Sequence, residues 1–401
     1  MILRSVKPFV LLQLASITSI ISGSMVFILF PWLALDISGS STVSGLLVTI
    51  TSIPGLLLSP VMGSIIDRFG RRRTAMWIEY LAAISCFLLP ITGWFTEINV
   101  VILIALGTLK ALVSSGSPSA RKSLVPDAAD AAHMTLPRAN GIHEAVFATG
   151  FAIGPAIAAV SITLIGAINA FWIVGAFAVL SGAFTWMIRV HEKHEEHDEE
   201  SGNPFVYAVQ GFKILFNTPA VLIVMSAFMF LAVVYLPTEM VVLPRYFNEI
   251  GYPEGLGLIV STMAICSTFG ALLFERLAKR FSYSTIFRGA ILGVAFGLLP
   301  MSQLPEQWLL LVFGAILGFT WGPLGPLLNT VIQEKIPANK RGRVFALEMA
   351  IWSAGPMISM AAVGGAIDNF GVRAVYLTLA ILVTVSAIIF GAQKKLNQLN
   401  H

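Results

Sequence analysis

The chain has 401 residues, of which 56% are hydrophobic and only 11% are charged, whereas soluble domains carry about 25% charged residues. This apolar surplus excludes an ordinary soluble protein, because a soluble core cannot hide so many apolar side chains and the lipid bilayer must solvate much of the surface. The formal charge of +4 does not indicate nucleic-acid binding, since the basic residues lie in short segments between long apolar runs.

A membrane-spanning helix needs about 20 apolar residues, and the chain is long enough for twelve spans with short loops. In chain order, the predicted spans are Phe9–Leu35, a run that ends at Ile66, Thr74–Phe95, Val100–Ser119, Ala139–Ile165, a run that ends near Ile188, Ala220–Leu243, Gly255–Phe274, Thr285–Met301, Trp308–Val331, Phe345–Ala366 and Ala374–Ala392. We therefore predict an all-α integral membrane protein with a six-helix bundle at residues 1–188, a cytoplasmic linker at 189–218 and a second six-helix bundle at 219–401.

The predicted linker begins with a charged run, His191–Glu200, which has no apolar periodicity and must lie in water. Its three histidines, spaced three residues apart, allow a metal site, but a hydrated linker explains the run as well, and we predict no metal. The next segment, Phe205–Phe216, is short and amphipathic. We expect it to lie along the membrane surface.

The positions of the basic residues predict the orientation of the chain in the membrane. Of the 25 Lys and Arg residues, all but Lys110, Arg245 and Arg373 fall on one side of the predicted topology. Because Lys and Arg accumulate on the cytoplasmic side, we expect both termini and the linker to face the cytoplasm.

One stretch, Gly63–Arg73, places a carboxylate and four arginines between two apolar runs. Its pattern, Gly-x-x-x-Asp-Arg-x-Gly-Arg-Arg, resembles the loop between the second and third helices of major facilitator superfamily transporters. Asp67 could accept hydrogen bonds from the N-terminal amides of a neighbouring helix, and the arginines could pair with carboxylates at helix ends. Such contacts would hold the cytoplasmic side shut in one conformation; alternatively, these charges only set the topology.

A degenerate copy of this arginine loop follows the eighth predicted span, where Glu275 and Arg276 align with Asp67 and Arg68. Two six-helix halves of this kind are typical of transporters that rock around a midplane site. We predict a conformational latch that consists of Gly63, Asp67, Arg68, Gly70, Arg71, Glu275 and Arg276.

The fifth predicted span carries small residues and a proline, with Gly150, Gly154 and Pro155 in one stretch. Small residues four apart let another helix approach closely, and a proline can bend the helix. The stretch resembles the Gly-x-x-x-Gly-Pro-x-x-Gly-Gly signature of drug–proton antiporters, which is associated with export, although Ala158 and Ala159 replace the last two glycines. A generic close-packed helix is the alternative.

Placing an ionisable side chain inside a membrane span costs free energy, so residues of this kind in the predicted spans are taken as candidates for a function. The candidates for proton or substrate coupling are Lys110, His143, Glu144, Glu239 and Glu348. Lys110 could instead be the structural partner of a buried carboxylate, and Glu239 could lie among the lipid headgroups. His143, Glu144 and Glu348 could pair with loop arginines. Glu79 is close enough to the cytoplasmic end of its span to be a partner of the latch.

A hydroxyl-rich first span and several aromatic residues suggest a wet cavity. The candidate cavity residues are Gln13, Ser16, Phe27, Trp32, Trp321, Asn329 and Trp352. For the aromatic residues the alternative is ordinary packing or contact with lipid.

The sequence has no phosphate-binding loop and no Ser-His-Asp arrangement, so we predict no cofactor and no enzymatic activity, and any pumping must use an ion gradient. The resemblance covers nearly the whole chain and is greatest to the antiporter group of macrolide efflux proteins and enterobactin exporters. It rests also on Leu136–Asn140 and on the segment from Ile336 to Pro356. The resemblance implies a bacterial inner-membrane transporter that exports an amphipathic drug or siderophore against inward proton flow.

Two alternatives remain open at this point. A transporter of the same fold could import a nutrient or an iron–siderophore complex, or flip a lysolipid, and the direction of transport would distinguish it. A non-transporting receptor or scaffold is a different class, which would show no substrate-dependent flux. We expect a monomer, because the two halves complete each other's interface.

Overall fold

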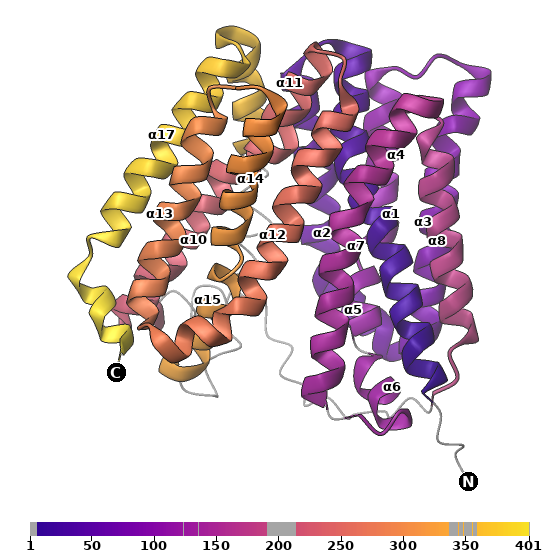
Figure 1. Ribbon diagram of the computed structural model, residues 1–401. Helices are drawn as coiled ribbons and strands as arrows, with labels where there is room; N and C mark the ends of the chain where they lie inside the picture. The colour runs from indigo at the N-terminus through magenta and orange to yellow at the C-terminus, as the bar shows by residue number, and fades with distance from the viewer. Residues whose placement is uncertain are drawn as a thin grey trace. The chain divides into compact units, whose positions relative to one another are not determined.

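The computed structural model describes residues 6–122, 124–134, 136–190, 214–336, 344, 348, 355 and 359–400, with the backbone alone described at 55–57, 59–68, 118–119, 136–138, 140–141, 333 and 400. All regular elements in these residues are helices (Figure 1). The chain divides into two compact units, one of Met1–Glu199 with Gly251–Gly257 and one of Glu200–Ile250 with Leu258–His401.

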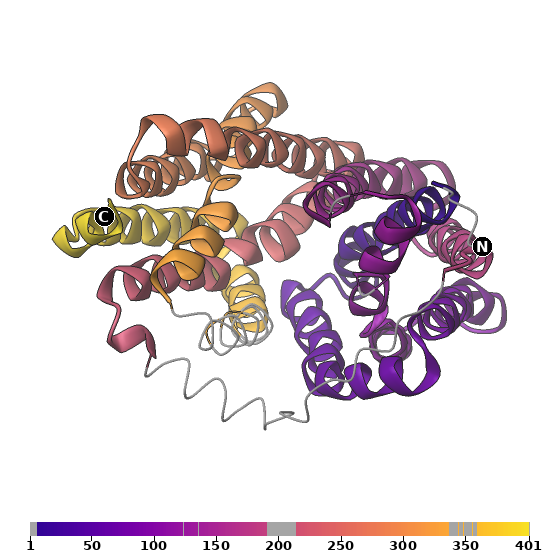
Figure 2. The ribbon, with the colours of Figure 1, turned by 90° about the horizontal axis from the view of Figure 1, so that it is seen from below.

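The first unit is organised around its first helix. Its elements are α1 (Lys7–Ser38), α2 (Ser41–Phe69), α3 (Arg71–Phe95), α4 (Val100–Ser114), α5 (Ser117–Lys122), α6 (Val125–Ala131), α7 (Leu136–Ile165) and α8 (Ala170–Met187). Helix α1 packs against α2, α7 and α8, and Figure 2, which looks along the helices, shows it in indigo among them. A helix with apolar residues on every side is expected in such a buried position, and Leu12, Met25 and Ile28 are fully buried.

The second unit contains α10 (Pro219–Pro237), a π-helical turn η1 (Thr238–Val242), α11 (Leu243–Glu249), most of α12 (Pro253–Arg280), α13 (Tyr283–Met301), α14 (Gln307–Trp321), α15 (Leu324–Lys335), α17 (Val372–Gly391) and the 3-10 turn η2 (Lys394–Asn400). The first residues of α12, up to Gly257, are grouped with the first unit. Residues 359–370 are also helical. Helix α13 packs against α14 and α17. Glycines let α12 and α14 approach closely, since a Cβ atom at Gly318 would collide with the backbone of Met263.

Nine helices among the described residues are long and apolar enough to cross a membrane. Two shorter apolar helices lie at Ser41–Pro54 and Val100–Ser114, where the second and fourth spans are predicted. The eleventh predicted span is described only in part, and most of the linker, including the His191–Glu200 run, lies outside the described residues. The prediction of an all-α integral membrane protein is confirmed.

Two connections differ from the sequence prediction. The arginine loop is shorter than expected, because α2 continues to Phe69 and α3 begins at Arg71. The single residue between them, Gly70, has φ +87°, which residues with a side chain rarely adopt. The polar segment after the fourth span, where the sequence predicts a loop with one short helix over residues 121–137, contains α6 and also the end of α5, which holds Arg121.

Candidate functional site

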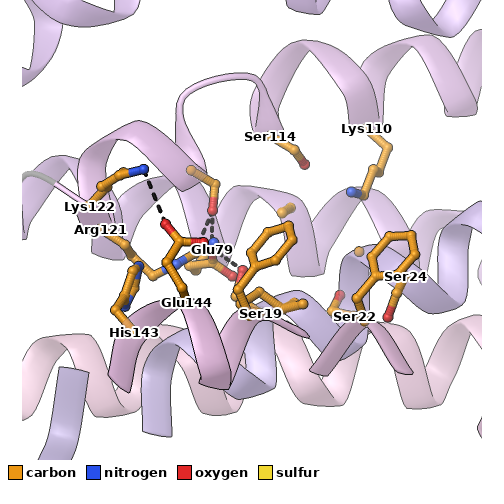
Figure 3. Close-up of a pocket in the computed structure, with 16 residues that line it drawn as sticks. Ser19, Ser22, Ser24, Glu79, Lys110, Ser114, Arg121, Lys122, His143 and Glu144 are labelled. Atoms are coloured by element: carbon orange, nitrogen blue, oxygen red, sulfur yellow. Dashed lines mark hydrogen bonds and ion pairs between the residues drawn. The ribbon is translucent and has the colours of Figure 1, made fainter. Parts of the chain in front are cut away.

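A cavity of about 450 Å³ lies within the first unit, between α1, α3, α4, α5 and α7 (Figure 3). Its volume is within the range of about 300–1,000 Å³ that is usual for small-molecule pockets. Glu79, Arg121, Lys122, His143 and Glu144 gather at one end of it, whereas Lys110 lies toward the other end with Ser22 and Ser24.

The most buried charges of the cavity are Glu79 on α3 and Arg121 on α5. Their side chains are only 3% and 5% exposed, and the guanidinium of Arg121 donates to Glu79 Oε1. The same carboxylate oxygen accepts from Ser117 and from Ser19, the latter at 2.8 Å. Burying a charge is costly unless it is paired and hydrogen-bonded. This ion pair, with its two hydroxyl donors, therefore joins α1, α3 and α5 at the cavity wall.

The second ion pair of the cavity is exposed to solvent. Lys122 Nζ is 3.3 Å from Glu144 Oε1, and the two side chains are 69% and 62% exposed. The neighbouring His143 is buried, and its Nδ1 lies 3.2 Å from Gln13 Oε1. The predicted coupling residues His143 and Glu144 thus lie together, with Gln13 beside them.

Lys110 on α4 points its ammonium group into the cavity (Figure 3). Within the described residues, no carboxylate lies within 4 Å of its ammonium group. The two carboxylates of the cavity pair with other cations, Glu79 with Arg121 and Glu144 with Lys122. The alternative that Lys110 is the partner of a buried carboxylate therefore finds no support among these residues.

The remaining walls combine hydroxyls with aromatic rings. Ser22 and Ser24 on α1 donate to backbone carbonyls, whereas the buried Ser114 hydroxyl has no partner among the described residues. On α7, Phe147 and Phe151 are stacked with their ring centroids 6.4 Å apart. Such a site suits a molecule with an apolar body and a few polar groups.

The glycines of the predicted antiporter-like helix bring α7 onto α1. A Cβ atom at Gly154 would collide with the Ser24 side chain and the carbonyl of Ile21, and one at Gly150 would press against Ile20. The Gly150 carbonyl accepts from Ser24 at 3.2 Å. Pro155 follows inside the same helix. This close packing of α7 on α1 positions the serine hydroxyls of α1 and the phenylalanine rings of α7 that line the cavity.

The predicted latch residues have different surroundings. Gly63, Asp67 and Arg68 lie in α2, where only the backbone is described. Arg71 Nη1 is 3.2 Å from Asp127 Oδ2 in α6. In the second unit, Glu275 pairs with Lys279 on its own helix, and Arg276 is exposed.

The other candidates do not share this cavity. Trp32 is buried in the core, and Ser16 is fully buried with no partner for its hydroxyl among the described residues. Phe27 contacts Phe151 edge to face, with ring centroids 5.7 Å apart. Asn329 is exposed, Glu348 is half-buried, and Trp352 lies outside the described residues.

An aromatic cluster in the second unit includes a tyrosine that contacts a carboxylate. Trp321 stands 4.8 Å from Tyr235 and 5.8 Å from Phe228 between ring centroids. The hydroxyl of Tyr235 donates to Glu239 Oε1. Glu239 lies in the π-helical turn η1, and π-turns inside helices are frequent at functional sites. No Lys or Arg in the described part of the chain lies within 4 Å of Glu239.

Sequence reasoning missed the central ion pair. It placed Arg121 in a cytoplasmic polar segment and named Glu79 only as a possible partner of the latch. A signal for Glu79 was present, since it lies about 12 Å along α3 from Arg71 at 1.5 Å per residue, too deep to remain without a partner. No comparable signal marked Arg121, because an arginine after a serine-rich segment also fits a loop.

The sequence matches the family model described as Major Facilitator Superfamily at residues 12–347 and 240–395. The multidrug efflux pump Tap of Mycolicibacterium fortuitum is 28% identical over 400 residues, which cover 98% of this chain and 97% of that protein. Macrolide efflux protein A of Streptococcus pyogenes is 23% identical over 365 residues, covering 88% and 87%.

Solved structures of similar fold include a mutant form of the nucleoside transporter NupG, with a TM-score of 0.79, 12% identity and coverage of 96% of this chain and 99% of that one. A bacterial homologue of the iron transporter ferroportin in an inward-facing state has a TM-score of 0.69, 15% identity and coverage of 96% and 99%. At such identities these structures are informative about the fold alone.

Proposed function

The chain belongs to the major facilitator superfamily and is a multi-pass membrane transporter, and from this premise we propose that it exports an amphipathic small organic molecule in exchange for protons. The family resemblance predicted from the arginine loop and from Gly154–Pro155 is confirmed, as is the fold of twelve transmembrane helices in two six-helix halves. Fold alone does not determine the substrate, so the rest of the proposal depends on the site.

The observation that carries the proposal is the cavity of the first unit. It combines stacked aromatic rings, hydroxyl groups and charges within about 450 Å³, which suits a molecule that is partly apolar and partly polar. The direction of transport follows the full-length relatives, whose names describe a multidrug efflux pump and a macrolide efflux protein. The distribution of Lys and Arg supports an inner-membrane protein with both termini in the cytoplasm.

We assign proton coupling to Glu239 by comparing it with Glu79 and Glu144, the two carboxylates that line the cavity of the first unit. Glu79 is neutralised by Arg121, and Glu144 pairs with Lys122. Among the described residues, Glu239 receives a side-chain hydrogen bond from the neutral Tyr235 hydroxyl alone, so it can gain and lose a proton without breaking an ion pair with any of them. A carboxylate inside a membrane span without a cationic partner is costly in its charged form.

The coupling acts through the two conformations of the transporter. Protonation of Glu239 removes a charge from the span, and it favours whichever conformation desolvates that carboxylate more completely. A ligand or proton can shift the equilibrium only by its differential affinity for the two conformations. Substrate in the first unit and a proton on Glu239 in the second can therefore exchange without direct contact.

The test is substrate-driven proton movement in everted membrane vesicles. Vesicles are energised, candidate drugs, dyes and siderophores are added, and a pH-sensitive dye reports the proton gradient. We expect one class of compound to dissipate the gradient in vesicles with the wild type and to have no such effect with Glu239→Gln. Glu97→Gln, which changes an exposed carboxylate, is the control and should behave as the wild type. Substrate flux with no proton movement would refute the coupling, and uptake into whole cells would refute export.

A further inference from the structure

We infer that the transported molecule is an amphipathic anion, whose carboxylate or similar acidic group binds Lys110 and Ser114 on α4. The inference rests on the proposed transport function and deepens it by assigning the chemical class of the substrate. It is carried by the charge balance of the cavity, by the two donors on α4 and by the aromatic rings of α7 that line the same cavity.

The charge balance leaves one positive charge without a partner in the cavity. Three cations and two carboxylates line it. The buried pair of Glu79 with Arg121 and the exposed pair of Glu144 with Lys122 account for four of these five groups. Lys110 remains, with no carboxylate of the described residues within 4 Å. Because a charge that is covered by a bound molecule is costly unless it is paired, a negative group of the substrate is the complement that this cavity lacks.

The second observation is the pairing of Lys110 with Ser114. Residues four apart lie on the same face of a helix, and Figure 3 shows both side chains on the cavity side of α4. The buried Ser114 hydroxyl has no hydrogen-bond partner within the described part of the chain, whereas the hydroxyls of Ser22 and Ser24 donate to backbone carbonyls. An ammonium and a free hydroxyl on one face are two donors for the oxygens of one acid group.

The apolar part of the substrate can be bound by the aromatic rings of α7. Phe147 and Phe151 stack in parallel, at an interplanar angle of 12°, and they line the same cavity as the two donors on α4. An aromatic or aliphatic body can rest on these rings while its acid group reaches α4. A cationic amphiphile of the same shape would meet Lys110 and be repelled.

The experiment measures binding to the purified full chain in detergent, with 1-naphthaleneacetate and 1-naphthylmethylammonium as probes that share one ring system and differ in charge. We expect the wild type to bind the carboxylate at least about tenfold more tightly, because a hydrogen bond to a charged group has about this effect on affinity. Lys110→Met should abolish the preference, and Lys110→Arg should keep it. Lys395→Met removes an exposed lysine far along the sequence, in η2, and controls for the change in total charge.

The outcomes separate this inference from the proposed function. Equal binding of the two probes, a preference for the ammonium probe, or a preference that persists in Lys110→Met overturns the inference, whatever the vesicle assay shows. Wild-type preference for the carboxylate without substrate flux in vesicles would leave the anion site in place and refute the transport proposal. Displacement of the bound carboxylate by lysophosphatidylglycerol would identify a lipid as the source of the anion, and failure to displace it would identify a soluble acid.

Discussion

Replacing Glu79 by glutamine should destabilise the protein far more than the same replacement at Glu144. The Glu79→Gln change leaves the guanidinium of Arg121, which is 5% exposed, without a counter-charge. Breaking a buried pair by removing one partner costs about 3–5 kcal/mol. We expect about 3 kcal/mol, the lower end of this range, because the glutamine oxygen can still accept from Ser19 and from Arg121.

Glu144→Gln is the matched control, since it breaks an ion pair that lines the same cavity. The side chains of Glu144 and Lys122 are 62% and 69% exposed, and pairs of this kind contribute about 0–1 kcal/mol. The free energy of unfolding is measured by titrating SDS into mixed micelles and following tryptophan fluorescence. Equal losses in the two variants would refute the assignment of Glu79 and Arg121 as a structural pair.

The double variant Glu79→Gln with Arg121→Met sharpens the test. If the cost of the single change is the buried unpaired charge, removing that charge as well should restore part of the lost stability. Additive losses in the double variant would mean that the two side chains do not interact in the folded protein.

Three further predictions use other contacts. Gly154→Val should lower the free energy of unfolding by about 1–3 kcal/mol through overpacking against Ser24, measured by the same titration with Gly23→Val, whose Cβ position is open, as control. Gly70→Ala should cost about 1–3 kcal/mol, because Gly70 has φ +87°; an unchanged unfolding curve would contradict this strain. Tyr235→Phe removes the hydrogen bond to Glu239 and should slow substrate-driven proton movement in vesicles while leaving substrate binding intact.

The fold was predictable from the sequence because membrane solvation acts on long stretches of the chain. Twenty apolar residues in a row have few alternatives to a spanning helix, and the charged segments between them show where each span ends. The errors occur where this constraint is weak. Gly70 allows a sharper connection than a loop of charged residues suggests, and the short helices α5 and α6 lie in a segment with no long apolar run.

The candidate site was only partly predictable. Lys110, His143 and Glu144 were identified because ionisable groups in apolar runs are rare, and the structure places all three on one cavity. The partner of Glu79 could not be predicted, because Arg121 is 42 residues away in sequence and their contact depends on how α3 and α5 pack. Spacing along one helix indicates which residues share a face, but it gives no distance between helices.

The contacts of Glu79, Glu144 and Glu239 indicate a different role for each of these three carboxylates. A carboxylate buried against a guanidinium, as in Glu79, stays charged and holds helices together, so it is poorly suited to exchange protons during transport. A carboxylate paired at an exposed position, as in Glu144, contributes little because water screens it. Glu239, whose hydrogen-bond donor is a neutral hydroxyl, can change its charge at the lowest structural cost. Lys110 is the corresponding case among the cations, because it has no carboxylate partner among the described residues. A proton can neutralise Glu239, and an acidic group of the substrate can pair with Lys110.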